Sequence, residues 1–290
     1  PGWLWLGLVV GLVLGALAAL LRDRLDQAIK VPGDMAKVGT TLPTLVEVPP
    51  APDTSGGLAS LRGDNDPAVE TYRSLRTNMQ FVAIDRDMKV VQVTSAIPGE
   101  GKTTTAANLA VVLAQADLRV LVLDADLRKP MVHEVFGVAT TRGLVDVLVG
   151  RPVEEVVHRV TDHLDVIAAG RIPVNPSEML SSRRMGEVLA DLRRRYDFIV
   201  VDSAPVLPVS DAAALSRHVD GTLVVVQAGR AKVPEVRQAI ERLDRVQAPL
   251  VGIVLNRVKG AARSAYGYGY GYGPGHRPGR HAGADEKPSV

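Results

Sequence analysis

The sequence contains no cysteine, which excludes disulfide bonds and thiolate metal sites. Its six histidines show no spacing typical of metal ligands, so we expect them to be solvated or part of the core. Excess charge is also lacking: a net charge of +2 and a pI near 9.0 argue against nucleic acid as a partner. Hydrophobic residues are plentiful, at 46% of 290 residues, enough for one large domain or two modest ones.

The first apolar segment, residues 3–21, runs for 19 residues without a charge. As a helix it would be about 28 Å long, close to the thickness of the hydrocarbon core of a bilayer. Two tryptophans at one end and Arg22 and Arg24 at the other are typical of the two membrane interfaces. We therefore predict a transmembrane helix at 1–21 in the inner (plasma) membrane, spanning it once, with the residues after it in the cytoplasm.

A cleaved signal peptide is the alternative for this segment, but no basic residue precedes the apolar run. Because the chain begins with Pro1, we expect a C-terminal piece of a longer polypeptide whose earlier part lies outside the membrane. Residues 22–62 are rich in proline and glycine and are predicted to form a cytoplasmic linker, with one extended segment at 44–48.

The most informative stretch is VVQVTSAIPGEGKTTT, residues 90–105. A β-branched apolar run, a glycine-bearing loop and an alanine-rich helical pattern follow one another, as in a P-loop. Glycines let the backbone N–H groups of such a loop surround phosphates, and the helix N-terminus adds partial positive charge. We therefore predict ATP and Mg²⁺ as cofactors. The predicted nucleotide-binding residues of the loop are Pro98, Gly99, Glu100, Gly101, Lys102, Thr103 and Thr104.

Short apolar runs alternate with helical patterns through the remainder of the chain. This alternation predicts an α/β fold of the P-loop NTPase type, a mostly parallel sheet covered by helices on both faces. The domain is expected to span residues 63–262. Strands are predicted at 89–94, 120–123, 164–168, 198–201, 223–226 and 251–255, and helices at 102–116, 175–195 and 232–246.

Three aspartates, Asp124, Asp126 and Asp202, stand at the ends of predicted strands. One alone would be explained as a helix N-cap, but the ends of parallel strands meet at the edge where such sheets bind ligands. We predict that Asp126 and Asp202 hold Mg²⁺ with Thr103, and that Asp124 accepts the proton or hydrogen bond of an attacking hydroxyl. With Lys102 reaching the phosphates, these residues form a predicted catalytic set for phosphoryl transfer.

Asp66 and Pro67 predict the start of a helix that carries Glu70, Arg73 and Arg76 roughly on one side. On spacing alone, a solvated face with an internal ion pair is favoured over a surface for self-association.

In the last segment, residues 263–290, tyrosines alternate with glycine and the hydrophobic pattern vanishes. This composition predicts a flexible tail with some tendency to self-associate. If the domain transfers phosphoryl groups, these tyrosines could also be the acceptors of the phosphoryl group. The 10 to 16 residues after Asn256 would reach roughly 35–50 Å when extended, enough to enter a neighbouring subunit. The predicted acceptors are Tyr266, Tyr268, Tyr270 and Tyr272.

Together these motifs resemble the bacterial tyrosine kinase (BY-kinase) family, whose members partner with or are fused to chain-length determinants of polysaccharide export. Residues 95–104 are similar to its Walker A motif, 124–130 to its Walker A′ motif and 198–202 to its Walker B motif. The charged helix matches the E-x2-R-x2-R motif through which members form rings, and the tail matches the family's tyrosine cluster. By the resemblance, Asn256 would lie against adenine.

The resemblance implies a membrane-anchored protein-tyrosine autokinase that phosphorylates its tail between subunits and regulates capsular or exopolysaccharide synthesis, chain length and export. It implies a homo-oligomeric ring, the polysaccharide polymerase or export machinery and a tyrosine phosphatase as partners. Related ParA/MinD-type ATPases, which act as assembly switches, are the alternative, but they carry an extra lysine where Ile97 stands here. A structural adaptor with an inactive site would not need three acidic positions. Two departures from the family pattern are Ala204, usually proline, and Asp117, usually glycine.

Overall fold

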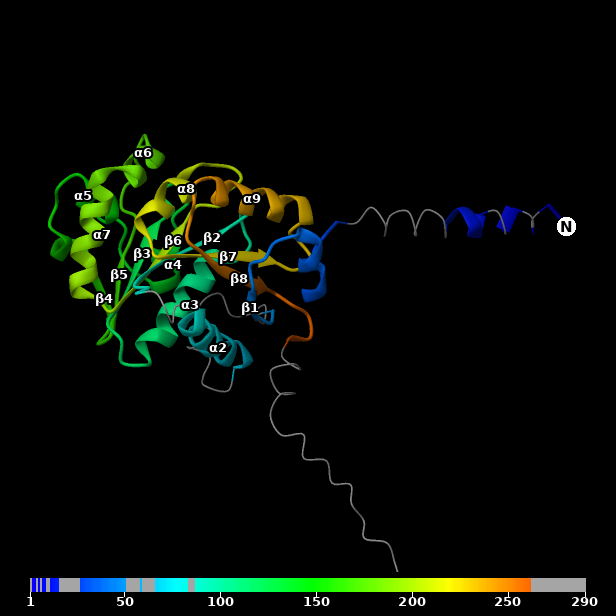
Figure 1. Ribbon diagram of the computed structural model, residues 1–290, viewed down its shortest axis with the longest axis horizontal. Helices are drawn as coiled ribbons and strands as arrows, with labels where there is room; N and C mark the ends of the chain where they lie inside the picture. The colour runs from blue at the N-terminus through cyan, green and yellow to red at the C-terminus, as the bar shows by residue number, and fades with distance from the viewer. Residues whose placement is uncertain are drawn as a thin grey trace, which may run out of the picture.

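The computed structural model describes residues 27–50, 66–82 and 87–261, together with Leu58 and scattered positions between 2 and 15. Its centre is an eight-stranded sheet of order β1-β8-β7-β2-β6-β3-β5-β4, in which only the β4–β5 pair is antiparallel (Figure 1). The strands are β1 (Thr44–Glu47), β2 (Val90–Ser95), β3 (Val120–Ala125), β4 (His158–Thr161), β5 (Leu164–Ile167), β6 (Phe198–Ser203), β7 (Gly221–Gln227) and β8 (Leu250–Asn256).

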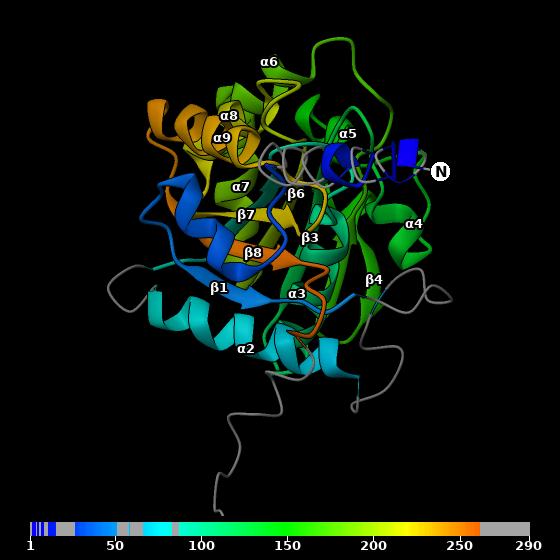
Figure 2. The ribbon, with the colours of Figure 1, turned by 90° about the vertical axis from the view of Figure 1, so that its right-hand side faces the viewer.

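Helices cover both faces of this sheet, α2 and α3 on one face and α7, α8 and α9 on the other (Figure 2). The α-helices are α2 (Pro67–Val82), α3 (Lys102–Ala114), α4 (Val132–Phe136), α5 (Leu144–Leu148), α6 (Pro176–Ser181), α7 (Arg183–Arg195), α8 (Asp211–Leu215) and α9 (Val233–Arg245). Short 3₁₀ helices are η1 (Pro32–Val38), η3 (Val153–Glu155) and η4 (Ser216–His218).

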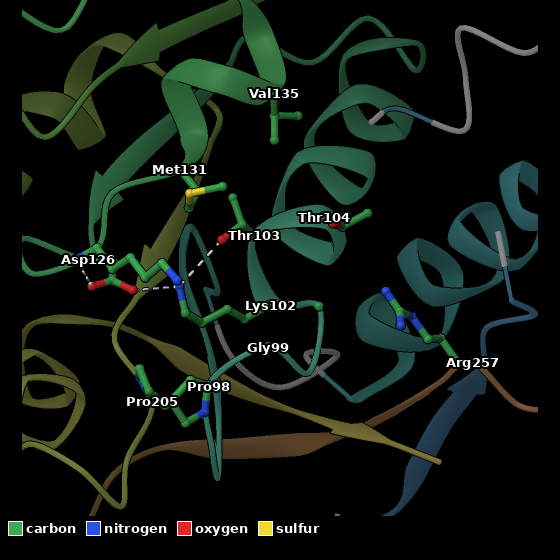
Figure 3. A pocket seen from close by; sticks show the side chains of 12 residues that line it. Pro98, Gly99, Lys102, Thr103, Thr104, Asp126, Met131, Val135, Pro205 and Arg257 are labelled. Carbon is green, nitrogen blue, oxygen red and sulfur yellow. Dashed lines mark hydrogen bonds and ion pairs between the residues drawn. The ribbon is translucent and has the colours of Figure 1, made fainter. Parts of the chain in front are cut away.

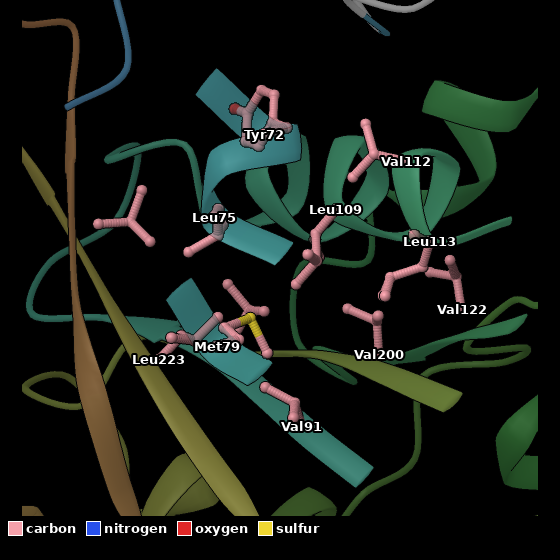
Figure 4. Packing of buried hydrophobic residues seen from close by; sticks show 14 of the residues in the cluster. Tyr72, Leu75, Met79, Val91, Leu109, Val112, Leu113, Val122, Val200 and Leu223 are labelled. Carbon is pink, nitrogen blue, oxygen red and sulfur yellow. The ribbon is translucent and has the colours of Figure 1, made fainter. Parts of the chain in front are cut away.

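The central strands are buried on both faces because successive side chains alternate between two cores. Val91 and Val93 of β2 pack with α2 and α3, as Figure 4 shows for Val91, whereas Val90 faces the cluster around α7. A strand buried on both faces needs a continuous apolar run, which is why these strands were readable in the sequence. The predicted α/β fold with a mostly parallel sheet is confirmed.

The predicted linker differs from the structure over residues 27–50. Ala28 forms a β-bridge with Lys232, η1 packs against α9, and β1 pairs in parallel with β8 as the edge strand. Ile29 is fully buried. The prolines and glycines are typical of irregular backbone, but apolar side chains between them fill the edge of the sheet. The extended segment expected at 44–48 corresponds to β1.

Two further differences concern local structure. The predicted helix 175–195 is divided, because Ser182 is extended and caps α7 by accepting the N–H of Met185. The exposed strand β4 lacks an apolar pattern and was not predicted. By contrast, α2 begins at Pro67 as predicted, with the Asp66 carboxylate accepting the N–H of Ala68 at 2.8 Å.

In the described part of the chain, no helix is both long and apolar enough to span a membrane. Much of the predicted transmembrane segment lies outside the described residues, as do the tail tyrosines.

Candidate functional site

The predicted P-loop joins β2 to α3 at the carboxyl edge of the sheet. Gly99 and Gly101 have φ angles of 82° and 94°, in the left-handed region that favours glycine. A Cβ on Gly101 would lie 2.2 Å from Nδ2 of Asn256, and one on Gly99 would lie 3.2 Å from Nη2 of Arg230. Backbone conformation therefore favours glycine at both positions, and at Gly101 lack of space excludes a side chain as well.

A cavity of about 340 Å³ lies beside the loop, within the usual size range of small-ligand sites (Figure 3). Its wall contains most of the predicted loop residues, one predicted aspartate and five residues that we did not predict. The lining residues are Pro98, Gly99, Gly101, Lys102, Thr103, Thr104, Asp126, Lys129, Met131, Val135, Pro205 and Arg257.

Lys102 is the cation at the centre of the site. Its Nζ lies 2.7 Å from Oδ2 of Asp126 and 3.5 Å from Oδ1 of Asp202, and Figure 3 shows it turned toward Asp126. Burial disfavours the ammonium ion, but the charges of Asp202 and Asp126 outweigh that effect and raise the pKa of Lys102. The lysine is thus held charged at the cavity wall.

Asp202 and Asp124 are fully buried on the adjacent strands β6 and β3, where they are register partners. Oδ2 of Asp202 accepts the hydroxyl hydrogen of Thr103 at 2.7 Å. Burial raises the pKa of Asp202, and burial together with the charge of Asp202 raises that of Asp124. Two carboxyls this close and this poorly solvated do not ionise independently.

The donors at this edge of the site suit Mg²⁺. A threonine hydroxyl and carboxylate oxygens are ligands that this ion prefers, and Thr103, Asp126 and Asp202 supply them around Lys102. In the described ranges, no group of three or more His, Cys, Asp or Glu side chains is arranged as a metal cluster. A magnesium ion here would therefore depend on Thr103, on phosphate oxygens and on water, as Mg²⁺ often does.

Asp124 does not line the cavity. Its Oδ1 accepts the N–H of Asp126 at 3.2 Å, and its Oδ2 accepts the N–H of Val132 at 3.1 Å. In this conformation the carboxylate lies beneath the loop that follows β3 and holds it, while Asp126 is the aspartate that faces the cavity.

Asn256 also lies beneath the P-loop rather than in the cavity wall. Its Nδ2 donates to the Glu100 carbonyl at 2.8 Å, and its Oδ1 accepts the N–H of Arg257 at 2.9 Å. In this structure Asn256 therefore supports the loop, and the adenine contact implied by the resemblance stays a prediction. Arg257, with a left-handed φ of 58°, lines the cavity instead.

The carboxylate of Glu100 ties the P-loop to β7. Oε2 accepts the N–H of Ile97 at 2.9 Å, and Oε1 accepts the N–H of Gln227 at 3.2 Å. The side chain is fully buried, and burial raises its pKa to about 7 in spite of these hydrogen bonds. Glu100 therefore shapes the loop from behind.

Replacing Glu100 by glutamine is expected to flatten the pH dependence of stability. A carboxyl whose folded-state pKa is raised from 4.5 to about 7 loses stability as the pH rises through this window, by up to about 3 kcal/mol. The amide cannot ionise, but its NH₂ would face a backbone N–H, at a pH-independent cost of about 1–3 kcal/mol. Urea unfolding between pH 4.5 and 8 should show the difference from wild type shrinking as the pH rises. Glu187→Gln, at an exposed position, is the control, and a constant difference for Glu100→Gln would contradict the assignment.

The predicted self-association residues lie on α2 with different surroundings. Glu70 and Arg73 form an exposed pair with 3.3 Å between Oε2 and Nη1. Arg76 instead donates to the Val112 carbonyl of α3 at 2.8 Å. Arg76 therefore links α2 to α3 within the chain, and the exposed part of the motif is the Glu70–Arg73 pair.

Sequence reasoning missed the support that residues 27–50 give to the site. Ile29 exchanges backbone hydrogen bonds with Gly229 and Ala231, on the loop that places Arg230 against the P-loop. Val48 donates to Leu255 and accepts from Val258, on either side of Asn256. These contacts join distant segments and carry no local pattern in the sequence.

Comparison with known proteins agrees with this architecture. Residues 88–252 match the family model described as an AAA domain. The tyrosine-protein kinase YwqD of Bacillus subtilis is 45% identical over 201 residues, which cover 69% of this chain and 85% of YwqD. The putative tyrosine-protein kinase EpsB of Ralstonia solanacearum is 39% identical over 90% of this chain, but the chain spans only 36% of EpsB. The solved kinase domain of the Escherichia coli tyrosine kinase ETK superposes with a TM-score of 0.73 at 32% identity, covering 79% of this chain and 95% of that domain.

The fold and the site define the class, a P-loop nucleotide-binding protein whose loop lies at the carboxyl edge of a mostly parallel sheet. Within that class, the likeness to YwqD and to the ETK kinase domain is decisive: the chain belongs to the bacterial tyrosine-protein kinase (BY-kinase) family. The family resemblance drawn from the motifs is thereby confirmed, as is the class of enzyme, a protein-tyrosine kinase.

Proposed function

We propose that this chain is the kinase part of a membrane-anchored protein-tyrosine autokinase, which transfers the γ-phosphoryl group of ATP to the tail tyrosines of a neighbouring subunit. The observation that carries the proposal is the placement of Lys102, buried between Asp126 and Asp202 at the wall of the cavity. Phosphoryl transfer requires a positive charge next to the phosphates, and a charged lysine beside a P-loop supplies it.

In this proposal the chain's own groups bind and orient the phosphates. The P-loop N–H groups surround them, and Lys102 turns from Asp126 toward the β- and γ-phosphates. Bound Mg²⁺ would neutralise charge that develops between these phosphates. The tyrosine oxygen forms a bond to the γ-phosphorus as the β–γ bridging bond breaks, which releases ADP. The phenolic proton passes to Asp124, whose carboxylate must first turn toward the cavity from the N–H groups of Asp126 and Val132.

Transfer between subunits requires assembly and a mobile acceptor. The Glu70–Arg73 pair on α2 has an exposed glutamate and belongs to the ring-forming motif of the family, which supports a homo-oligomeric ring. The proposed acceptors, Tyr266, Tyr268, Tyr270 and Tyr272, lie outside the described residues. Four phosphates would add roughly −6 to −8 charges to the tail, which a carboxylate-rich site would repel. Phosphorylation would in this way release the tail.

Anchoring is proposed for the uncharged segment 3–21 in the inner (plasma) membrane, with the kinase domain in the cytoplasm. At its described positions the segment is helical, and Trp3 and Leu12 are 89% and 68% exposed, which favours a lipid surround. By family likeness, the cycle would regulate capsular or exopolysaccharide synthesis, chain length and export. The partners would be the polymerase or export machinery and a tyrosine phosphatase.

A second candidate is an ATPase switch of the ParA/MinD type, whose nucleotide state governs association without tyrosine transfer. The observation that favours it is the position of Asp124, whose two oxygens both accept backbone N–H groups instead of facing the cavity. Attack on ATP by a water molecule would require less rearrangement of this loop than attack by the larger tyrosine side chain. Hydrolysis of ATP without phosphotyrosine in the assembled protein would support the switch.

The test mixes two variants, neither of which can phosphorylate its own tail, in membranes or vesicles. Tags of different length distinguish the two chains on a blot. One carries Lys102→Met with an intact tail, and the other carries phenylalanine at all four tail tyrosines with an intact site. With ATP and Mg²⁺, anti-phosphotyrosine blotting should give no signal from either chain alone. The mixture should give signal on the Lys102→Met chain, because its tail enters the intact site of its neighbour.

Adding Arg73→Ala to both chains should abolish the signal of the mixture if α2 forms the contact between subunits. Phosphotyrosine on the Lys102→Met chain when it is incubated without the other chain would contradict the assigned site. The absence of signal from the mixture and from the unmodified protein would refute tyrosine transfer and leave the switch.

A further inference from the structure

We infer that Asp211, the first residue of α8, is a positioning residue of the phosphoryl-transfer site, which acts through an ion pair with Arg128 to hold the loop that carries Asp126. Asp211 lies in none of the sequence motifs discussed above. The inference rests on the proposed function for its kinetic consequence, but its geometric part concerns the nucleotide-free protein.

The ion pair is bidentate. Nε of Arg128 donates to Oδ2 of Asp211 at 2.8 Å, and Nη2 donates to Oδ1 at 3.1 Å. Oδ1 also accepts the hydroxyl of Ser177 at the start of α6, and the Ser210 hydroxyl donates to that of Ser177 at 3.2 Å. Asp211 is fully buried, and in the described part of the chain its one ion pair is with Arg128. A fork of this kind restricts both distance and orientation.

The backbone of Arg128 in turn sets the position of Asp126. Oδ1 of Asp126 accepts the N–H of Arg128 at 3.3 Å and that of Lys129 at 3.0 Å. The other oxygen, Oδ2, faces Nζ of Lys102 at 2.7 Å. One oxygen of the carboxylate is therefore held by the loop, and the other points at the lysine that would bind phosphate.

The pair also connects the two strands that carry the acidic residues. Arg128 follows β3, whereas Asp211 belongs to the helix that follows β6, the strand of Asp202. The strands β3 and β6 are neighbours in the sheet. Fixing Arg128 to Asp211 therefore fixes Asp126 relative to Asp202, and Lys102 contacts both. Groups that orient ligand-binding side chains typically change affinity or activity by about 10–100-fold when removed.

The test uses Asp211→Asn and Arg128→Lys, two variants that break the fork in different ways. The amide loses the charge, whereas the lysine keeps the charge but cannot donate two parallel hydrogen bonds. Arg193→Lys is the matched control, because Arg193 also forms a bidentate pair, with Asp220 at 2.7 and 2.8 Å. Asp220 lies immediately before β7 and so at the ends of the strands opposite the site.

Two measurements are made on the full chain. Hydrogen exchange of residues 126–132 in the nucleotide-free protein should accelerate about 10-fold or more in both variants and remain unchanged in Arg193→Lys. The kcat of tail phosphorylation should fall about 10–100-fold, with a smaller change in KM for ATP, because a misplaced carboxylate disturbs the transition state more than the binding of ATP.

To distinguish positioning of Asp126 from a general structural role, Asp211→Asn is also made in a protein that already carries Asp126→Asn. If Asp211 acts through Asp126, the second substitution adds less than about 3-fold to the loss; independent effects would multiply, and this outcome would overturn the inference. Wild-type exchange at 126–132 in Arg128→Lys would overturn it as well, even where Asp211→Asn fails to fold. If the unmodified protein forms no phosphotyrosine, the proposed function fails, while the exchange measurement still decides the positioning role.

Discussion

Asp202→Asn is expected to abolish phosphoryl transfer while making the nucleotide-free protein more stable. The carboxylate is fully buried beside Asp124, and burial raises its pKa even though Lys102 opposes that shift. The site therefore disfavours the charge that catalysis uses. Asparagine keeps an oxygen for the Thr103 hydroxyl, now 2.7 Å away, but removes the negative charge.

The sign of the stability change follows from the direction of the pKa shift. An acid whose folded-state pKa is raised makes its contribution to stability below its unfolded pKa and loses it as the pH rises through the folded value. The asparagine variant avoids this loss, so its advantage in stability over wild type should be absent near pH 4 and present near pH 8. We expect about 0.5–2 kcal/mol there, the usual size of a single stabilising substitution. Transfer should fall by about 10²–10³ or more, because a group that handles developing charge is lost.

Asp197→Asn is the matched control for urea unfolding and for phosphotyrosine formation. Asp197 lies just before the same strand, and hydrogen bonds from the Arg119 side chain and backbone lower its pKa to about 2. Its replacement should therefore decrease stability near neutral pH and leave transfer intact. Equal or lower stability of Asp202→Asn than of wild type at pH 8 would show that the carboxylate is held favourably in the empty site.

Lys102→Met is expected to have the opposite effect on stability and the same effect on activity. The ammonium is the cation nearest to the Asp126 and Asp202 carboxylates, at 2.7 and 3.5 Å. Removing one partner of a buried ion pair leaves charge without compensation and typically costs about 3–5 kcal/mol. Because this lysine would also contact the β- and γ-phosphates, affinity for ATP should fall sharply and transfer by about 10³-fold or more.

Calorimetric titration with ATP and Mg²⁺ measures the affinity, and urea unfolding measures the stability. Lys37→Met is the control, since Lys37 is 69% exposed and pairs with Asp34 on η1, away from the cavity. A surface pair of this kind is worth about 0–1 kcal/mol. Wild-type affinity of Lys102→Met for MgATP would contradict the placement of the phosphates on this loop. Restored stability in the double variant Lys102→Met/Asp202→Asn would confirm that the loss is one of charge balance.

The P-loop and the central strands could be predicted because both are encoded locally. Gly99 and Gly101 occupy left-handed backbone conformations, and the strands are continuous apolar runs buried on both faces. Asp117, just after the end of α3, is a further example. Its φ of 60° is the left-handed conformation for which glycine is usual after a helix. In each case neighbouring residues define the conformation.

The placement of the polar side chains could not be predicted in this way. Asp124 and Asp126 are two residues apart, yet one lies beneath its loop and the other faces the cavity. Asn256 supports the P-loop across the sheet, and Arg257 reaches the cavity because its backbone is left-handed. These outcomes depend on which backbone N–H groups and which counter-charges the folded chain brings within reach.

The sequence by itself determined the α/β fold, the phosphate-binding loop and the edge of the sheet where the aspartates collect, since periodicity and glycine chemistry act over a few residues. Only the tertiary structure decided that residues 27–50 complete the domain and brace two loops of the site. It also decided that Asp211 lies against Arg128, 83 positions away in the chain. Contacts at such separations arise from packing and charge pairing in three dimensions, which no local pattern records.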